Sequence, residues 1–276
     1  MYKMKRIMTL ALSLVLLLSM ASCEKSSDKV LRVGMECAYA PYNWSQIDDS
    51  NGAVPIADTG EYAYGYDVMM AKYLADKMGL ELQIKKIDWD SLPVAVQSGT
   101  IDCVIAGQSI TAKRLKAVDF TTPYYYASVV ALTSSSSKFA NAKSVADLDG
   151  AKATSQINTI WYDVCLPQIP NCAIQTAMET APSMLVALNS GIVDLVVTDA
   201  PTAQAAVIAY PDLKVLNFAG SADDFKVSEE EINIGISVKK GNTELLDALN
   251  AALANLTTAD FEKMMADAIL AQPLSK

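Results

Sequence analysis

The stretch Gly107-Gln108-Ser109-Ile110-Thr111-Ala112-Lys113-Arg114 follows an apolar strand expected at Cys103–Ala106 and leads into a helix expected at Thr111–Val118. A polar loop therefore joins a buried strand to a helix that carries Arg114 in its first turn. A helix start favours a small anion, because its N–H groups are free and its dipole is positive there. The arginine adds a planar pair of donors that matches a carboxylate. We expect this stretch to capture a ligand with a carboxylate.

Strands and helices alternate on both sides of this stretch. The other expected strands are Val30–Met35, Glu81–Lys86, Val129–Thr133, Lys152–Ser155, Leu195–Thr198 and Ile232–Val238. The other expected helices are Tyr66–Met78, Leu92–Gln97, Asn158–Cys165, Pro182–Ser190, Pro201–Tyr210 and the tail from Thr243. This alternation predicts an α/β fold whose sheets are mostly parallel and covered by helices on both faces. Ligands of such sheets bind beyond the carboxyl ends of the strands.

Two segments of the chain repeat one pattern. Leu92 to Asp102 and Met184 to Asp194 each contain an apolar helix, a Ser-Gly pair and an aspartate that precedes a buried strand. The repetition predicts two lobes of similar build with a cleft between them.

The first residues have the features of a secretory signal. Basic residues precede the apolar run Leu10–Leu18, which is too short to span a bilayer comfortably. The segment Ser19–Cys23 resembles a bacterial lipobox, in which the cysteine is lipidated. We expect a lipoprotein signal peptide over 1–22, a lipid on Cys23 and a polar tether over 23–29. The protein would then be exported and lipid-anchored at the cell membrane, at an extracellular face or in a periplasm. A plain signal peptide with an incidental cysteine is the alternative.

Composition excludes several classes of function. The chain has 22 basic and 31 acidic residues, so its formal net charge is −9, and it has no histidine. An acidic surface argues against nucleic-acid binding. The lack of histidine removes Ser-His-Asp and Cys-His catalysis.

The cysteines predict disulfides rather than a metal site. They have no CxxC spacing, and export favours disulfides. Cys165 and Cys172 flank a short loop and are expected to form a bridge. Cys37 and Cys103 end two apolar strands, where a bridge and two buried free thiols are equally acceptable. No metal is expected.

Several motifs occur in an order that is typical of one family. They are Val33-Gly34-Met35-Glu36, Tyr39-Ala40-Pro41-Tyr42-Asn43-Trp44, Gly65-Tyr66-Asp67-Val68, Trp89 with Leu92, Ser98-Gly99-Thr100-Ile101-Asp102, Ser109-Ile110-Thr111 with Arg114, Asp119-Phe120-Thr121, Asp147-Leu148-Asp149-Gly150, Gln156 with Thr159, and Asp199 before Pro201. With them the chain from about Leu31 onward resembles the extracellular solute-binding proteins of ABC transporters for polar amino acids. The resemblance implies a two-lobed periplasmic-binding-protein type II fold. Lobe 1 would comprise 30–128 and 232–276, lobe 2 would comprise 129–231, and the ligand cleft would lie between them.

The resemblance also implies a role for each matching residue. Arg114 would pair with the α-carboxylate of the ligand, assisted by Ser109 and by N–H groups near Gly107 and Thr159. Asp199 would accept the α-ammonium group from the other lobe. The expected wall of the cleft consists of Glu36, Tyr39, Tyr42 and Trp44, with Gln108, Gln156 and Trp161 as further wall residues.

Two departures from the family pattern bear on the ligand. Asn158-Thr159 stands where the family has Gly-Thr, and asparagine tolerates the positive φ that glycine supplies. Gln108 replaces an apolar residue. The acids and aromatic faces would suit a basic side chain, whereas Gln108 or Gln156 could bond an amide such as that of glutamine. A polar, and possibly basic, amino acid is therefore expected.

The function implied is capture of a free amino acid and its delivery to an ABC permease and ATPase by hinged closure. The protein would act as a monomer, without cofactor, catalysis or nucleic-acid partner. Two alternatives remain: a sensing module for a receptor, and a dehydratase of aromatic amino-acid synthesis that uses Glu36 as acid or base. Genomic neighbours would separate transport from sensing.

Overall fold

The computed structural model describes residues 30–273. The predictions for the signal peptide, the lipid on Cys23 and the tether concern residues that lie outside this range. Within it, no helix combines the length and the apolar character needed to cross a membrane.

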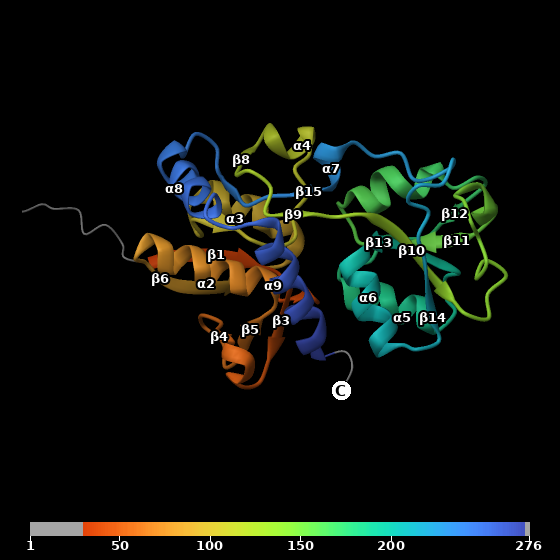
Figure 1. Ribbon diagram of the computed structural model, residues 1–276, viewed down its shortest axis with the longest axis horizontal. Helices are drawn as coiled ribbons and strands as arrows, with labels where there is room; N and C mark the ends of the chain where they lie inside the picture. The colour runs from red at the N-terminus through yellow and green to blue at the C-terminus, as the bar shows by residue number, and fades with distance from the viewer. Residues whose placement is uncertain (1–29, 274–276) are drawn as a thin grey trace, which may run out of the picture. The chain divides into compact units, whose positions relative to one another are not determined.

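Two five-stranded sheets organise the described chain (Figure 1), in the orders β6-β1-β7-β16-β8 and β12-β11-β13-β10-β14. The first sheet contains β1 (Val30–Met35), β6 (Glu81–Lys86), β7 (Cys103–Val104), β8 (Val118–Phe120) and β16 (Ser237–Lys239). The second contains β10 (Val129–Ser134), β11 (Lys152–Thr154), β12 (Ala173–Ile174), β13 (Leu195–Asp199) and β14 (Leu213–Leu216). Each sheet with its helices forms one lobe, which confirms the two-lobed α/β architecture. We call them the first and the second lobe.

Two small sheets complete the strands. The first lobe carries β2 (Ala38–Tyr39), β3 (Asn43–Gln46), β4 (Val54–Pro55) and β5 (Tyr62–Tyr64). The pair β9 (Tyr125–Tyr126) and β15 (Asn233–Ile234) is antiparallel, with Tyr126 opposite Asn233. The chain leaves the first sheet before β9 and returns through β15, so this pair marks the two crossings between the lobes.

The sheets are less parallel than expected. Strands β1 and β7 are parallel, as are β11 with β12 and with β13. However, β10 and β16 run antiparallel to both of their neighbours. Both strands follow a crossing directly, without the helical connection that a parallel neighbour requires. The single strand expected at Ile232–Val238 is divided into β15, which pairs with β9, and β16, which pairs with β7 and β8.

The helices cover both sheets. They are α2 (Tyr66–Met78), α3 (Leu92–Ser98), α4 (Ala112–Leu115), α5 (Ala181–Asn189), α6 (Ala200–Ala209), α7 (Glu229–Ile232), α8 (Thr243–Leu253) and α9 (Thr258–Ala271). Local chemistry fixes their ends: Gly79 ends α2 in the left-handed conformation, and a capping box at Thr180 begins α5. Helix α9 packs against α2 of the first lobe and α6 of the second (Figure 1).

The helix expected at Thr111–Val118 is shorter than predicted. Helix α4 has four residues, and the Thr111 hydroxyl already accepts the N–H of Arg114 at 3.2 Å. Val118 instead begins β8, which pairs with β16. A single turn has little dipole, so the start of α4 contributes less to anion binding than the sequence indicated. The prediction of an anion site here then depends mainly on the arginine side chain.

The repeated pattern has a structural counterpart in both lobes. The carboxylate of Asp102 accepts the backbone N–H of Arg32 at 2.8 Å, next to the start of the first sheet. The carboxylate of Asp194 accepts the N–H of Lys152 at 3.0 Å in the second sheet. Each aspartate thus follows a short apolar helix and accepts a backbone N–H from a strand of its own lobe, β1 for Asp102 and β11 for Asp194.

The disulfide expected between Cys165 and Cys172 is absent, because both residues are free thiols. Cys165 lies fully buried in the π-helical turn Trp161–Cys165, and a 3-10 turn, Leu166–Gln168, follows directly. The Cys172 thiol instead meets the backbone N–H of Ala153 on β11. The segment between the two cysteines is therefore folded into turns without a bridge between them. Cys37 and Cys103 are also free and buried, which resolves the alternative left open for them.

Candidate functional site

Most of the predicted site residues meet where the two lobes face each other. A small hollow of about 10 Å³ is lined by Tyr39, Trp89, Gly107, Ser109, Arg114, Gln156, Thr159 and Trp161. All of these except Trp89 are predicted site residues. Asp199 and Glu36 join the group through hydrogen bonds to Tyr39 and Gln156. A hollow of this size holds at most about one water molecule, so a solute enters only if the lobes separate.

Arg114 provides a positive charge that bridges the lobes. Its guanidinium donates to the carbonyl oxygen of Ser109 at 2.8 Å and, across the lobes, to that of Asn158 at 3.0 Å. It also lies over the Trp89 ring, 5.3 Å from the centroid. Within residues 30–273 it forms no ion pair. Burial lowers its pKa to about 10, which leaves it charged at neutral pH. A half-buried arginine held by neutral carbonyls is suited to a carboxylate.

Asp199 provides the negative charge on the second lobe. It is fully buried at the end of β13 and caps α6, accepting the Thr202 N–H and hydroxyl, both at 2.9 Å. The Tyr39 hydroxyl donates to the same carboxylate from the first lobe. Burial raises the pKa of Asp199. A buried carboxylate without a cation is a good acceptor for an ammonium group. To bind Asp199, that ammonium group would have to displace the Tyr39 hydroxyl from the carboxylate.

Glu36 forms a second contact between the lobes. The side-chain amide of Gln156 donates to one Glu36 oxygen at 3.1 Å. The other oxygen is buried, and no hydrogen bond to it is formed within residues 30–273. Burial raises the Glu36 pKa from 4.5 to about 7, although the bond from Gln156 opposes this shift.

This shift predicts a pH dependence of stability. The folded state binds a proton on Glu36 more tightly than the unfolded state, so its contribution to stability decreases as pH rises from about 4.5 to 7. We expect Glu36→Gln, which cannot ionise, to gain about 3 kcal/mol in unfolding free energy relative to wild type between pH 4 and pH 8. Chemical denaturation of both proteins at the two pH values measures the gain. Asp67, whose pKa is also raised, is present in both proteins, so its contribution to the pH dependence cancels in the comparison. A difference independent of pH would contradict the burial of Glu36 as a charged group.

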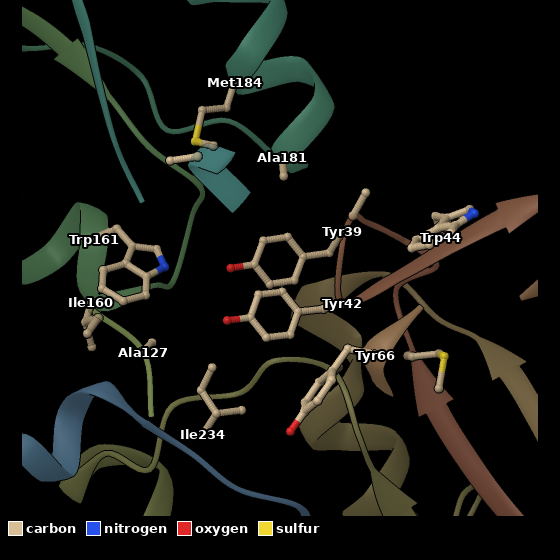
Figure 2. Close-up of a cluster of buried hydrophobic side chains, with 14 of the residues drawn as sticks. Tyr39, Tyr42, Trp44, Tyr66, Ala127, Ile160, Trp161, Ala181, Met184 and Ile234 are labelled. Carbon is tan, nitrogen blue, oxygen red and sulfur yellow. The ribbon is translucent and has the colours of Figure 1, made fainter. Parts of the chain in front are cut away.

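The aromatic residues divide into two groups (Figure 2). Tyr39 and Tyr42 stack with centroids 4.8 Å apart, and their hydroxyls point toward Trp161. Trp44 points the opposite way, packs edge-on against Tyr64 and lines a separate hollow of about 240 Å³. Trp44 therefore does not line the small hollow, and its place in the wall of the ligand site stays a prediction.

Three further predictions concern the loops. Asn158 has φ of 56°, so asparagine does adopt the left-handed conformation expected of it. Thr159 follows, and its hydroxyl donates to the Gln156 carbonyl at 2.7 Å. Gln108 is buried but lines a larger hollow beside the small one.

Trp89 is a site residue that sequence reasoning assigned no role. Its indole N–H donates to the Ile157 carbonyl of the second lobe at 3.1 Å, and its face supports Arg114. The sequence indicated Trp89 only as a member of a family motif. Its position in the turn that precedes α3 was the one sign that it could reach the site.

A buried carboxylate positions the loops of the first lobe. Asp67 accepts the Tyr124 hydroxyl and the Asn43 amide, each at 2.7 Å. The Tyr124 oxygen in turn accepts the Gly107 N–H at 3.2 Å, and the Asn43 oxygen accepts the Cys37 N–H at 2.7 Å. Burial raises the Asp67 pKa to about 7. One aspartate thereby fixes both the loop before Arg114 and the loop that carries Tyr39.

Two lobes joined by two crossings carry an arginine on one and a buried aspartate on the other, an arrangement suited to a small charged ligand held between them. The sequence profile of the bacterial extracellular solute-binding proteins, family 3, matches residues 31–267. The chain belongs to this family, which is one of solute-binding proteins and not of enzymes.

Relatives extend over nearly the whole chain. The L-cystine-binding protein TcyJ of Escherichia coli K12 is 27% identical over 226 residues, which cover 82% of this chain and 77% of that protein. The arginine-binding extracellular protein ArtP of Bacillus subtilis is 28% identical over 251 residues, covering 88% and 87%. The solved structure of the amino acid ABC transporter substrate-binding protein AbpA of Streptococcus pneumoniae, bound to L-arginine, is 26% identical. It has a TM-score of 0.73 and covers 88% of this chain and 96% of that one. The type II fold expected from the sequence is confirmed.

Proposed function

We propose that this protein binds a free amino acid outside the cytoplasmic membrane and delivers it to an ABC permease and its ATPase. One observation carries the proposal: Arg114 on the first lobe has no carboxylate partner within residues 30–273, and Asp199 on the second has no cation there. These charges are complementary to the two ends of a zwitterion. Because one charge lies on each lobe, a zwitterion favours the closed arrangement of the lobes.

The moving bodies in this proposal are lobe 1, at 30–128 and 232–276, and lobe 2, at 129–231. The crossing pair of β9 and β15 supports this division. The Tyr39 hydroxyl would act as a substitute for the ligand ammonium, since it already donates to Asp199 across the lobes.

The Tyr39 contact yields a testable expectation. A hydrogen bond to a charged group contributes about 1.5–3 kcal/mol, so Tyr39→Phe is expected to open the protein when no amino acid is added. Small-angle scattering measures this as a larger radius of gyration. The matched control is Tyr42→Phe, because the Tyr42 hydroxyl is buried without a hydrogen-bond partner among the described residues. Equal radii for the two variants would disprove the role of Tyr39.

The ligand we favour has a basic or otherwise polar side chain. Glu36 has one unpaired buried oxygen, and Tyr39 and Trp89 offer aromatic faces for a cation. Two of the relatives described above bear arginine in their names or structures, which agrees with this preference. Gln156 remains available to an amide.

The cellular setting follows from the same proposal. The family is extracellular, and we propose that a lipid on Cys23 holds the protein at the membrane as a monomer. No cofactor or catalytic step is needed for capture and delivery, and Glu36 then serves in binding rather than as an acid or base.

A thermal-melt panel of the twenty amino acids tests the proposal. The protein is unfolded and refolded to remove any co-purified ligand. A ligand at a hundred times its dissociation constant adds about 2.7 kcal/mol to stability. We expect a clear shift with arginine, lysine or glutamine. The absence of a shift with all twenty would overturn the proposal.

A further inference from the structure

Two consecutive residues of each lobe form hydrogen bonds directly across the lobes. The Trp89 indole N–H donates to the Ile157 carbonyl at 3.1 Å. The Asn158 side-chain amide donates to the Asp90 carboxylate at 2.8 Å. On the first lobe, both partners belong to the 3-10 turn Trp89–Ser91 that precedes α3. We call the bond between Asp90 and Asn158 the latch.

The latch lies outside the hollow that contains the charges suited to a zwitterion. Asp90 and Asn158 are exposed, and they line the larger hollow but not the small one. A ligand ammonium group has to displace the Tyr39 hydroxyl from Asp199, whereas a ligand in the small hollow has no need to displace the latch. The latch therefore differs from the other contacts between the lobes, because it is compatible with an enclosed solute.

The backbone of Asn158 is suited to this role. Its φ is 56°, and its carbonyl oxygen accepts the Arg114 guanidinium at 3.0 Å. The first lobe thus holds Asn158 at two points, the carbonyl through Arg114 and the side chain through Asp90. Glycine adopts this left-handed conformation without strain. Asn158→Gly therefore removes the latch and keeps the carbonyl that Arg114 contacts.

We propose that Asp90 and Asn158 are positioning residues that set how long the protein retains its solute. The inference rests on the proposed function, in which release of an enclosed amino acid requires the lobes to separate. Separation of the lobes breaks the latch, so the latch slows release. Because neither side chain lines the small hollow, the latch slows the release of every bound amino acid by the same factor and does not select among them.

Stopped-flow tryptophan fluorescence tests this inference, since Trp89 and Trp161 both line the small hollow. Rates measured over a range of amino-acid concentrations give the dissociation rate of wild type, Asn158→Gly, Asp90→Ala and the double variant. We expect each single variant to dissociate about fivefold faster, which corresponds to about 1 kcal/mol, the usual net contribution of one hydrogen bond. The double variant should also dissociate about fivefold faster, because both changes remove the same bond.

The chain offers a closely matched control inside the second lobe. Asn171 also has a left-handed backbone, with φ of 47°, and its side-chain amide donates to the Asp149 carboxylate at 2.7 Å. Both of these residues are exposed. Asn171→Gly and Asp149→Ala therefore remove the same kind of bond without affecting a contact between the lobes. Their dissociation rates should equal that of wild type.

Two kinetic results would overturn the inference. One is an Asn158→Gly dissociation rate equal to that of Asn171→Gly. The other is a double variant in which the effects of Asn158→Gly and Asp90→Ala multiply, since independent effects mean that the two side chains do not act through one bond.

Failure of all twenty amino acids to bind wild type would instead overturn the proposed function. In that case small-angle scattering without amino acid decides whether the latch holds the lobes together. A larger radius of gyration for Asn158→Gly than for Asn171→Gly would support the latch, and equal radii would overturn it.

Discussion

Replacing Arg114 by alanine is expected to weaken amino-acid binding by at least about 2 kcal/mol, roughly thirtyfold. The guanidinium is held in place by the Ser109 and Asn158 carbonyls and by the Trp89 ring. A ligand carboxylate that leaves water beside it loses its main charged donor in the variant. The affinity is measured by calorimetric titration of the refolded protein.

The matched control is Lys113→Ala on the same helical turn. It removes the same charge from an exposed residue that lines the larger of the two adjoining hollows and not the smaller one. Its affinity for the free amino acid should equal that of wild type. An Arg114→Ala affinity within about threefold of wild type would refute the carboxylate role, since that difference is less than 1 kcal/mol.

Replacing Asp199 by asparagine is expected to weaken binding by about 2–5 kcal/mol, the range for truncating one member of a buried charge pair. Asparagine is as good a helix N-cap as aspartate, so α6 keeps its start. The variant therefore removes the charge that an ammonium group needs while it preserves the cap on Thr202.

Asp212→Asn is the control for this variant, because it makes the same change of charge at an exposed residue of the second lobe. Both variants should melt within a few degrees of wild type when no amino acid is added. Asp199→Asn with wild-type affinity would show that the ammonium group binds elsewhere.

Local patterns predicted much of the fold. The strand β1 and the helix α2 have the expected bounds, because apolar spacing and a terminal glycine define them within a few residues. The prediction for α4 was wrong because Val118 pairs with β16, more than a hundred residues further along the chain. The disulfide prediction was wrong because the segment between its cysteines folds into a 3-10 turn. A distant strand partner decided the first case, and a local turn decided the second.

The candidate site, like the fold, was predicted only in part. Motif order was sufficient to gather Arg114, Ser109 and Thr159 around one hollow. It gave no indication that Tyr39 donates to Asp199, 160 positions away, or that Trp89 supports Arg114. These contacts depend on how the lobes meet, which the sequence of either lobe alone does not determine. Trp44 is directed away from Tyr39 and Tyr42 in Figure 2, an orientation that the order of the motifs did not indicate.

The central claim is that Arg114 and Asp199 hold the two ends of a zwitterion. Its most direct test is calorimetric titration of wild type with the preferred amino acid, its N-acetyl derivative and its carboxamide. The N-acetyl derivative lacks the ammonium charge, and the carboxamide lacks the carboxylate. We expect the parent amino acid to bind and each derivative to lose at least about 2 kcal/mol of affinity. Binding of either derivative with the affinity of the parent would contradict the account.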